Sequence, residues 1–253
     1  MLIVLVMFIL GLVLGFVGAG GAGVVIAVLT VVFGIPIHTA LGTSLSAMVF
    51  TTMSGAYSHF REGNVVMKNG IAVGIFGALG AFIGAHFAAL LPGSQLQWMT
   101  ACMLFLSAIL LWLRVFVYAK KNFSHTGNKS LPVGVRFWLT ACGLGLFTGI
   151  LSGTFGIGAT PFIQIGLLVL FGMTIHQSAG TTMLVILPIA LLGGVGYLAA
   201  GYLDVTLLIK VTTGLTTGAY IGAKFTKKLP PFVLKTAMVT VPILGGILLI
   251  VGS

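Results

Sequence analysis

Acidic residues are nearly absent from this chain, which has only two, Glu62 and Asp204, among 253 residues. Membrane pumps and cation antiporters normally use a buried carboxylate as cation ligand or proton carrier. Both acids lie near predicted ends of apolar segments, so we expect neither of these activities. The chain also lacks a His-Glu-x-x-His motif, paired aspartates and a P-loop. The sequence therefore predicts no enzyme, no metal site and no cofactor.

Cysteine and charge are also scarce. The two cysteines, Cys102 and Cys142, lie inside apolar runs and predict no disulfide framework. Charged residues make up 6% of the chain and hydrophobic residues 58%, with a mean hydropathy of +1.22. So few charges do not cover a soluble globule. Because the only longer polar stretch is about 120–130, we expect a single membrane domain embedded in a lipid bilayer.

Basic residues, in contrast, exceed acidic ones and give a formal net charge of +10. They cluster in a few loops between apolar segments, which indicates membrane topology rather than binding to nucleic acid. These loops are expected to face the cytoplasm. Their residues are Arg61, Lys68, Arg114, Lys120, Lys121, Lys129, Arg136, Lys224, Lys227, Lys228 and Lys235.

The two halves of the chain repeat each other at an offset of 138 residues without a gap. Between 11–92 and 149–230 there are 24 identities in 82 pairs, of which ten are glycine and only seven are Val, Leu or Ile, so shared apolar composition does not explain the match. We predict a first repeat over 1–118, a basic cytoplasmic linker over 119–132 and a second repeat over 133–253. Duplication of this kind is typical of transporters whose site lies where the repeats meet.

Each half contains five apolar segments. The sequence predicts helices at about 2–17, 22–33, 39–58, 70–91 and 97–118, then at 133–151, 159–171, 178–200, 205–227 and 234–252. The first of these lacks the basic region of a signal peptide, and we interpret it as a retained membrane segment. The second segment of each half is too short for a full span and is predicted as a half-helix or re-entrant piece.

The positions of the basic loops predict how the halves are oriented. We take the central loop to be cytoplasmic. If each half has an odd number of segments, the basic loops near Arg61 and Lys228 are then cytoplasmic as well, and both termini lie outside. The fold expected is an all-α polytopic membrane protein of two inverted repeats with about five transmembrane or re-entrant helical segments each.

Glycine clusters and hydroxyl pairs recur in both halves and predict the binding site. Glycine lets backbone approach a ligand, and a helix that begins there directs its N–H groups and positive dipole end toward it. Ser and Thr add neutral donors, so a small anionic substrate is predicted. The substrate-binding residues expected are Gly18, Gly20, Gly21, Gly42, Thr43, Ser44, Gly156, Gly158, Thr160, Gly180, Thr181 and Thr182. Glycine at four-residue spacing also mediates helix packing, the interpretation favoured for Gly80, Gly84, Gly218 and Gly222.

The ordered motifs resemble the TauE/SafE sulfite exporter family over essentially the whole chain. They are the glycine stretch 18–23, Ala40-Leu-Gly42-Thr43-Ser44-Leu45, and His59-Phe-Arg61-Glu-Gly63-Asn64-Val65. The resemblance implies export of sulfite or a small organosulfonate across the bacterial inner (plasma) membrane. The chain departs from the family pattern in the second copy, where Tyr197 and Ala199 replace His59 and Arg61.

Histidines and one arginine are candidates for gating or proton coupling. His38 and His176 coincide under the repeat, and a helix cap is as good an interpretation of them as a ligand contact. His59 and Arg61 lie near the cytoplasmic end of their segment, where His59 changes charge near neutral pH. An interfacial anchor is the equally weighted alternative for His59.

The sequence thus predicts a secondary transporter that exports a small oxyanion by alternating access. Two alternatives stay open: an anion channel using the same residues, and an accessory membrane subunit that scaffolds a sulfur-metabolism system. The transported anion, the coupling ion and the presence of a homo-oligomer are also left open.

Overall fold

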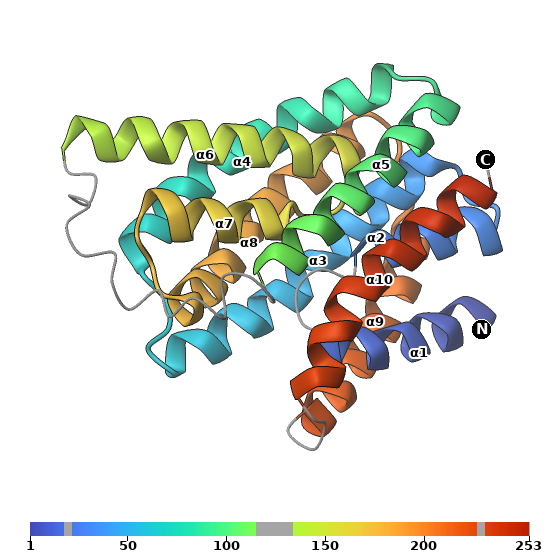
Figure 1. Cartoon of the computed structure of the whole chain (residues 1–253). Coiled ribbons are helices and arrows are strands. Elements are labelled where there is room, and N and C mark those ends of the chain that lie inside the picture. The colour runs from blue at the N-terminus through green and yellow to red at the C-terminus, as the bar shows by residue number, and fades with distance from the viewer. Residues whose placement is uncertain (18–21, 115–133, 227–230, 253) are drawn as a thin grey trace.

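The computed structural model describes residues 1–17, 22–114, 134–226 and 231–252, and these residues form a bundle of helices (Figure 1). The first half contains α1 (Leu2–Val17), α2 (Ala22–Ala27) continued by a π-helical turn (Val28–Val32), α3 (Ile37–Arg61), α4 (Met67–Leu90) and α5 (Gly93–Trp112). The second half contains α6 (Val135–Phe155), α7 (Thr160–Leu170), α8 (Ile175–Ala199), α9 (Val205–Thr226) and α10 (Pro231–Val251). Every predicted apolar segment corresponds to helix, which confirms the all-α polytopic fold.

Helix length separates full spans from shorter pieces. Four described helices, α4, α5, α6 and α8, are long and apolar enough to cross a membrane. By contrast α7 has 11 residues, and at 1.5 Å per residue it extends only about 16 Å. A bilayer core is about 30 Å thick, so α7 does not cross it alone. The α2 segment is equally short, and all of its residues from Ala22 to Ala27 are buried.

The helix ends gather on two opposite faces of the bundle. On the terminal face, defined by the start of α3, the end of α4 and the turn before α9, the Nε2 atom of His38 lies 3.1 Å from the carbonyl oxygens of Ala88 and Leu91, and its ring stacks on Tyr202. Both chain ends lie toward this side, at the right of Figure 1. The opposite basic face has the end of α3 and the starts of α4, α6 and α8.

Glycine allows two pairs of helices to pack with their backbones almost touching. A methyl group added to Gly80 of α4 would lie 2.5 Å from the carbonyl oxygen of Leu146 in α6. In the other half, Gly218 of α9 faces the backbone of Phe8 in α1. Under the offset of 138, Gly80 corresponds to Gly218 and Phe8 to Leu146, so the two contacts are equivalent in the two repeats. The packing role predicted for these glycines is therefore confirmed.

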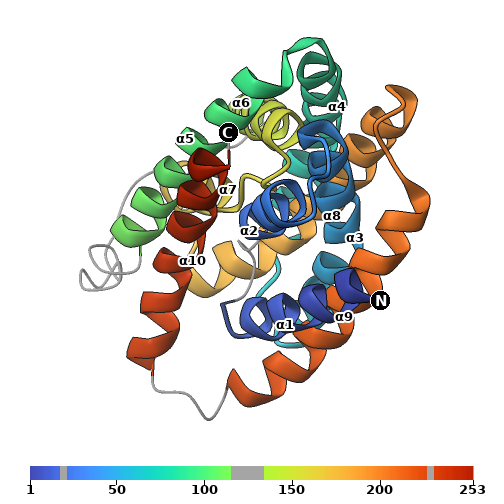
Figure 2. The same cartoon turned by 90° about the vertical axis from the view of Figure 1, so that its right-hand side faces the viewer.

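The first helix of each half thus packs against a helix of the other half. The first-half helix α1 packs on α9, and the second-half helix α6 packs on α4. Figure 2 shows these pairs on opposite sides of a centre that contains α2, α3, α7 and α8.

The central helices α3 and α8 run antiparallel. Gly42, near the start of α3, packs against Tyr197 near the end of α8, where an added methyl would lie 2.8 Å from the tyrosine Cβ atom. Gly180, near the start of α8, packs against His59 near the end of α3. Under the offset of 138, Gly42 corresponds to Gly180 and His59 to Tyr197, so the two contacts are the same contact made in each direction. Such reciprocity is the property of a two-fold related interface.

Filling the α4–α6 contact tests whether it determines stability. We expect Gly80→Val to lower the free energy of unfolding by about 1–3 kcal/mol, because the added carbons overlap backbone that has no room to move. The melting temperature of the detergent-solubilised protein measures this effect.

Gly143→Val is the matched control, since Gly143 lies in α6 with nothing within 4 Å of an added methyl group. Equal melting temperatures for the two variants would contradict the close-packing account.

Candidate functional site

The connection between α6 and α7 is a short break of irregular backbone inside the bundle. Gly156 ends α6 with φ of 64°, and Gly158 and Ala159 follow with φ of 69° and 45°. These left-handed conformations favour glycine. Pro161 lies in the first turn of α7, where its missing N–H costs no helical hydrogen bond. The predicted helix start after the glycine cluster is confirmed.

Helix α3 covers this break. A methyl group added to Gly156 would lie 3.1 Å from the Cα and carbonyl oxygen of Leu41, and Gly158 faces the side chain of Met48. The fully buried Tyr197 of α8 donates its hydroxyl to the carbonyl oxygens of Gly153 at 2.8 Å and Thr154 at 3.3 Å. The end of α6 is therefore held between α3 and α8.

Several hydroxyl groups on the helices around the break are buried without a hydrogen-bond partner. Thr43 of α3 and Thr160 at the start of α7 are both 0% exposed, and neither Oγ1 atom has a partner. The Oγ atoms of Ser46 in α3 and Ser152 in α6 share this property. Buried polar groups are nearly always paired in folded proteins. Unpaired hydroxyls on α3, α6 and α7, the helices that adjoin the break, are consequently the feature that marks this region as a candidate site.

Other predicted hydroxyls do have partners. Ser44 donates to the carbonyl oxygen of Ala22 at 3.2 Å, which places the start of α2 beside α3. Thr182 donates to the carbonyl oxygen of Ser178 in its own helix at 2.6 Å. The Oγ1 atom of Thr181 accepts from the backbone N–H of Val66 at 3.0 Å. A substrate contact for these three residues stays a prediction.

The predicted glycines divide into those at the break and those in helix contacts. Gly156 and Gly158 form the break, whereas Gly42 and Gly180 lie in the α3–α8 contact described above. Close packing is enough to require glycine at the latter two positions. Gly18, Gly20 and Gly21 lie outside the described residues.

The gating candidates lie away from the break. His38 contributes its ring to the terminal face, and His59 lies 3.6 Å from Glu62 at the basic end of α3. Arg61 and His176 are exposed at the ends of α3 and α8. No structural observation tests their predicted role. Within the described ranges, no group of three or more His, Cys, Asp or Glu is placed to hold a metal ion.

One polar contact was not anticipated from the sequence. Arg114, treated above as a loop charge, is buried, and its Nη1 atom donates to Oε1 of the buried Gln164 in α7. For Gln164 the sequence indicates a buried amide that needs partners, with pore lining and helix–helix hydrogen bonding as equal alternatives. Arg114 has Gly252 as its repeat counterpart, so the duplication gave no signal for it.

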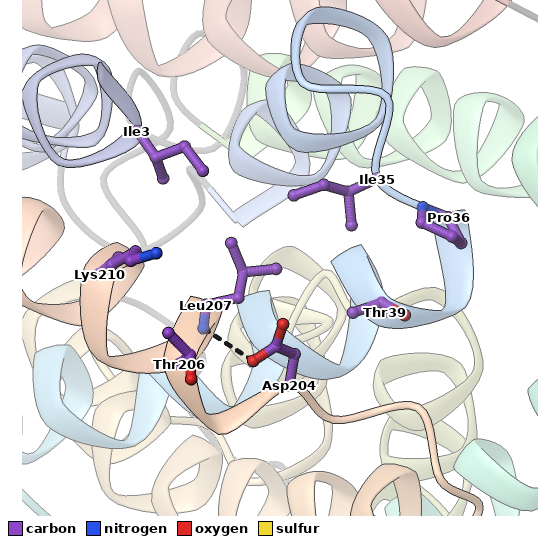
Figure 3. A pocket seen from close by; sticks show the side chains of 8 residues that line it. All are labelled: Ile3, Ile35, Pro36, Thr39, Asp204, Thr206, Leu207 and Lys210. Carbon is purple, nitrogen blue, oxygen red and sulfur yellow. Dashed lines mark hydrogen bonds between the residues drawn. The ribbon is translucent and has the colours of Figure 1, made fainter. Parts of the chain in front are cut away.

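An open pocket lies on the terminal face rather than at the break. It measures about 430 Å³ and is lined by Ile3, Ile35, Pro36, Thr39, Asp204, Thr206, Leu207 and Lys210. Figure 3 shows Lys210 and Thr39 on opposite sides of the pocket, with Asp204 accepting from the N–H of Leu207. None of the predicted substrate-binding residues lines it.

Removing the Tyr197 hydroxyl tests how the break is held. We expect Tyr197→Phe to lower the free energy of unfolding by roughly 1–3 kcal/mol, because two buried carbonyl oxygens lose their donor. Thermal unfolding in detergent measures the change. Tyr57→Phe is the control, since Tyr57 is 66% exposed. Unchanged stability of Tyr197→Phe would contradict the assigned role.

Comparison with known proteins places the chain among membrane transporters. The family model described as sulfite exporter TauE/SafE matches residues 3–249. The probable membrane transporter protein YdhB of Bacillus subtilis is 54% identical over 99% of this chain and 100% of its own length. A probable membrane transporter protein of Xylella fastidiosa is 25% identical over 84% of this chain and 79% of its own, and the corresponding figures for MJ0441 of Methanocaldococcus jannaschii are 26%, 91% and 87%. No solved structure matches.

Proposed function

Because the chain belongs to the TauE/SafE sulfite exporter family of membrane transporters, we propose that it exports a small oxyanion, sulfite or a small organosulfonate, across the bacterial inner (plasma) membrane. The observation that supports this proposal best is the set of buried, unpaired hydroxyls on α3, α6 and the start of α7, the helices that adjoin the break. The transported anion supplies the missing acceptors.

The chemistry of the break suits an anion more than a cation. The first N–H groups of α7 have no partner within the helix, and the positive end of the helix dipole lies there. Thr43 and Thr160 add neutral donors that are already free of water. Both acids of the chain lie elsewhere, at the end of α3 and the start of α9, so no carboxylate competes with the substrate.

The two repeats, 1–118 and 133–253, are inverted relative to each other in this proposal. Its support is the antiparallel α3–α8 contact, in which equivalent residues meet reciprocally, together with the packing of α1 and α6 on helices of the other half. A two-fold axis perpendicular to membrane-crossing helices lies in the membrane plane, which is the geometry of inverted-repeat transporters. Alternating access then follows from movement of one packed pair, α1 with α9 or α4 with α6, against the centre. The linker 119–132 lies outside the described residues.

The proposed orientation has the basic face in the cytoplasm and the open pocket outside. In a cysteine-free background, Ser94→Cys at the start of α5 is expected to react with a membrane-impermeant maleimide in intact cells, and Glu62→Cys is expected not to. Both positions are exposed, so permeabilised cells should label both. Labelling of only Glu62→Cys in intact cells would reverse the orientation.

Removing the unpaired hydroxyls tests the site itself. We expect Thr43→Val and Thr160→Val each to reduce the rate of sulfite efflux from proteoliposomes about ten-fold, since a hydrogen bond to a charged group contributes roughly 1.5–3 kcal/mol. Folding should be retained, because neither hydroxyl has a protein partner to lose.

The matched control is Thr100→Val, which removes a fully buried hydroxyl that donates to its own helix at the carbonyl oxygen of Leu96. Wild-type efflux by both site variants would contradict the assignment. Counterflow of labelled sulfite against an unlabelled gradient is expected for a carrier. Flux that neither saturates nor shows counterflow would instead identify an anion channel.

A further inference from the structure

Arg114 is a buried cation for which the described residues provide incomplete pairing. It follows the last turn of α5 at the basic face and is only 7% exposed. Its Nη1 atom donates to Oε1 of Gln164, which is 4% exposed, while its Nε atom has no hydrogen-bond partner. A neutral amide oxygen is thus the acceptor that the structure offers to this guanidinium.

No carboxylate is positioned to neutralise this charge. The whole chain has two acidic side chains. Glu62 lies 3.6 Å from the Nδ1 atom of His59, and Asp204 accepts from Leu207 at the start of α9, on the terminal face. Among the described residues, neither acid forms an ion pair with Arg114. Because an unpaired buried charge is strongly unfavourable, the counter-charge is best supplied by a mobile anion.

The position of Arg114 connects it to the central break. Gln164 follows Thr160 by four residues in α7, so both side chains lie on the same face of that helix. From the break, α7 runs toward the basic face, where Phe171 just beyond its end contacts Phe137 at the start of α6. Thr160, Gln164 and Arg114 therefore succeed one another from the break toward the basic face.

We propose that Arg114 and Gln164 form a second oxyanion-binding site, on the basic side of the break. The proposal deepens the function proposed above and rests on it for the class of ligand. A guanidinium has five N–H donors in a planar fork that fits two oxygens of a sulfite, sulfate or sulfonate group. An arriving anion displaces the oxygen of Gln164, because a charge-assisted hydrogen bond is stronger than one to a neutral amide. The released amide can turn its N–H donors to the same anion.

Thermal unfolding in detergent tests the site without requiring transport. Wild type, Arg114→Met and the control Arg136→Met are titrated with sodium sulfite against sodium chloride at equal ionic strength. Arg136 is an exposed cation at the same face, so its removal controls for the general loss of positive charge. We expect sulfite to raise the melting temperature of wild type and Arg136→Met, and Arg114→Met to lose more than half of that increase.

The melting temperature without sulfite separates binding from a structural role. Arg114→Met is expected to unfold at the wild-type temperature or above, because it removes an uncompensated charge. A lower temperature combined with a full sulfite-induced increase would overturn the proposal. If Arg114→Met does not fold, the same sulfite titration is made with Arg114→Lys. Loss of the two-pronged contact should raise the half-maximal sulfite concentration about ten-fold, and an unchanged value would overturn the proposal.

Sulfite uptake into inside-out vesicles distinguishes this site from the proposed function. Arg114→Met is expected to raise the half-saturating sulfite concentration at the cytoplasmic side about ten-fold. Unchanged uptake together with unchanged stabilisation would reject the Arg114 site and leave sulfite transport intact. Stabilisation that depends on Arg114, with no uptake by either protein, would support the site and reject sulfite export.

Discussion

The backbone break between α6 and α7 depends on being covered by protein. Inside a bilayer no water pairs with free N–H and C=O groups, so irregular backbone is tolerated only where neighbouring residues bury or bind it. Here α3 lies across Gly156 and Gly158, and Tyr197 binds the carbonyl oxygens at the end of α6. Thr160, at the start of α7, is fully buried, as is Thr43 in the covering helix α3. In the proposed function, the packing that covers the break also prepares the start of α7 to bind an anion.

Glycine determines how closely the covering helices approach. At the α4–α6 and α1–α9 contacts, glycines bring backbone against backbone, so close dispersion contact replaces the hydrophobic effect that lipid does not provide. These pairs form two outer units around α3 and α8 (Figure 2). In the proposed alternating access, each of these tightly packed pairs moves as one unit against the centre.

Much of the fold could be predicted from the sequence, because apolar length and the repeat are properties of the chain itself. The start of α7 was predicted from the glycine cluster that includes Gly158, and the packing of Gly80 from its four-residue spacing with Gly84. Individual hydroxyl roles could not be predicted, because they depend on tertiary partners. Thr43 and Thr181 are equivalent in sequence, yet Thr181 accepts from Val66 while Thr43 has no partner. Arg114 was missed for a similar reason, since a cation at the end of an apolar segment usually reaches water.

A cryo-electron microscopy map of the protein with bound sulfite tests the central claim most directly. The account predicts density for the anion at the α6–α7 break, within hydrogen-bonding distance of the Thr43 and Thr160 hydroxyls and the first N–H groups of α7. A break closed by protein in every class of particles, with sulfite only in the outer pocket beside Lys210, would contradict it.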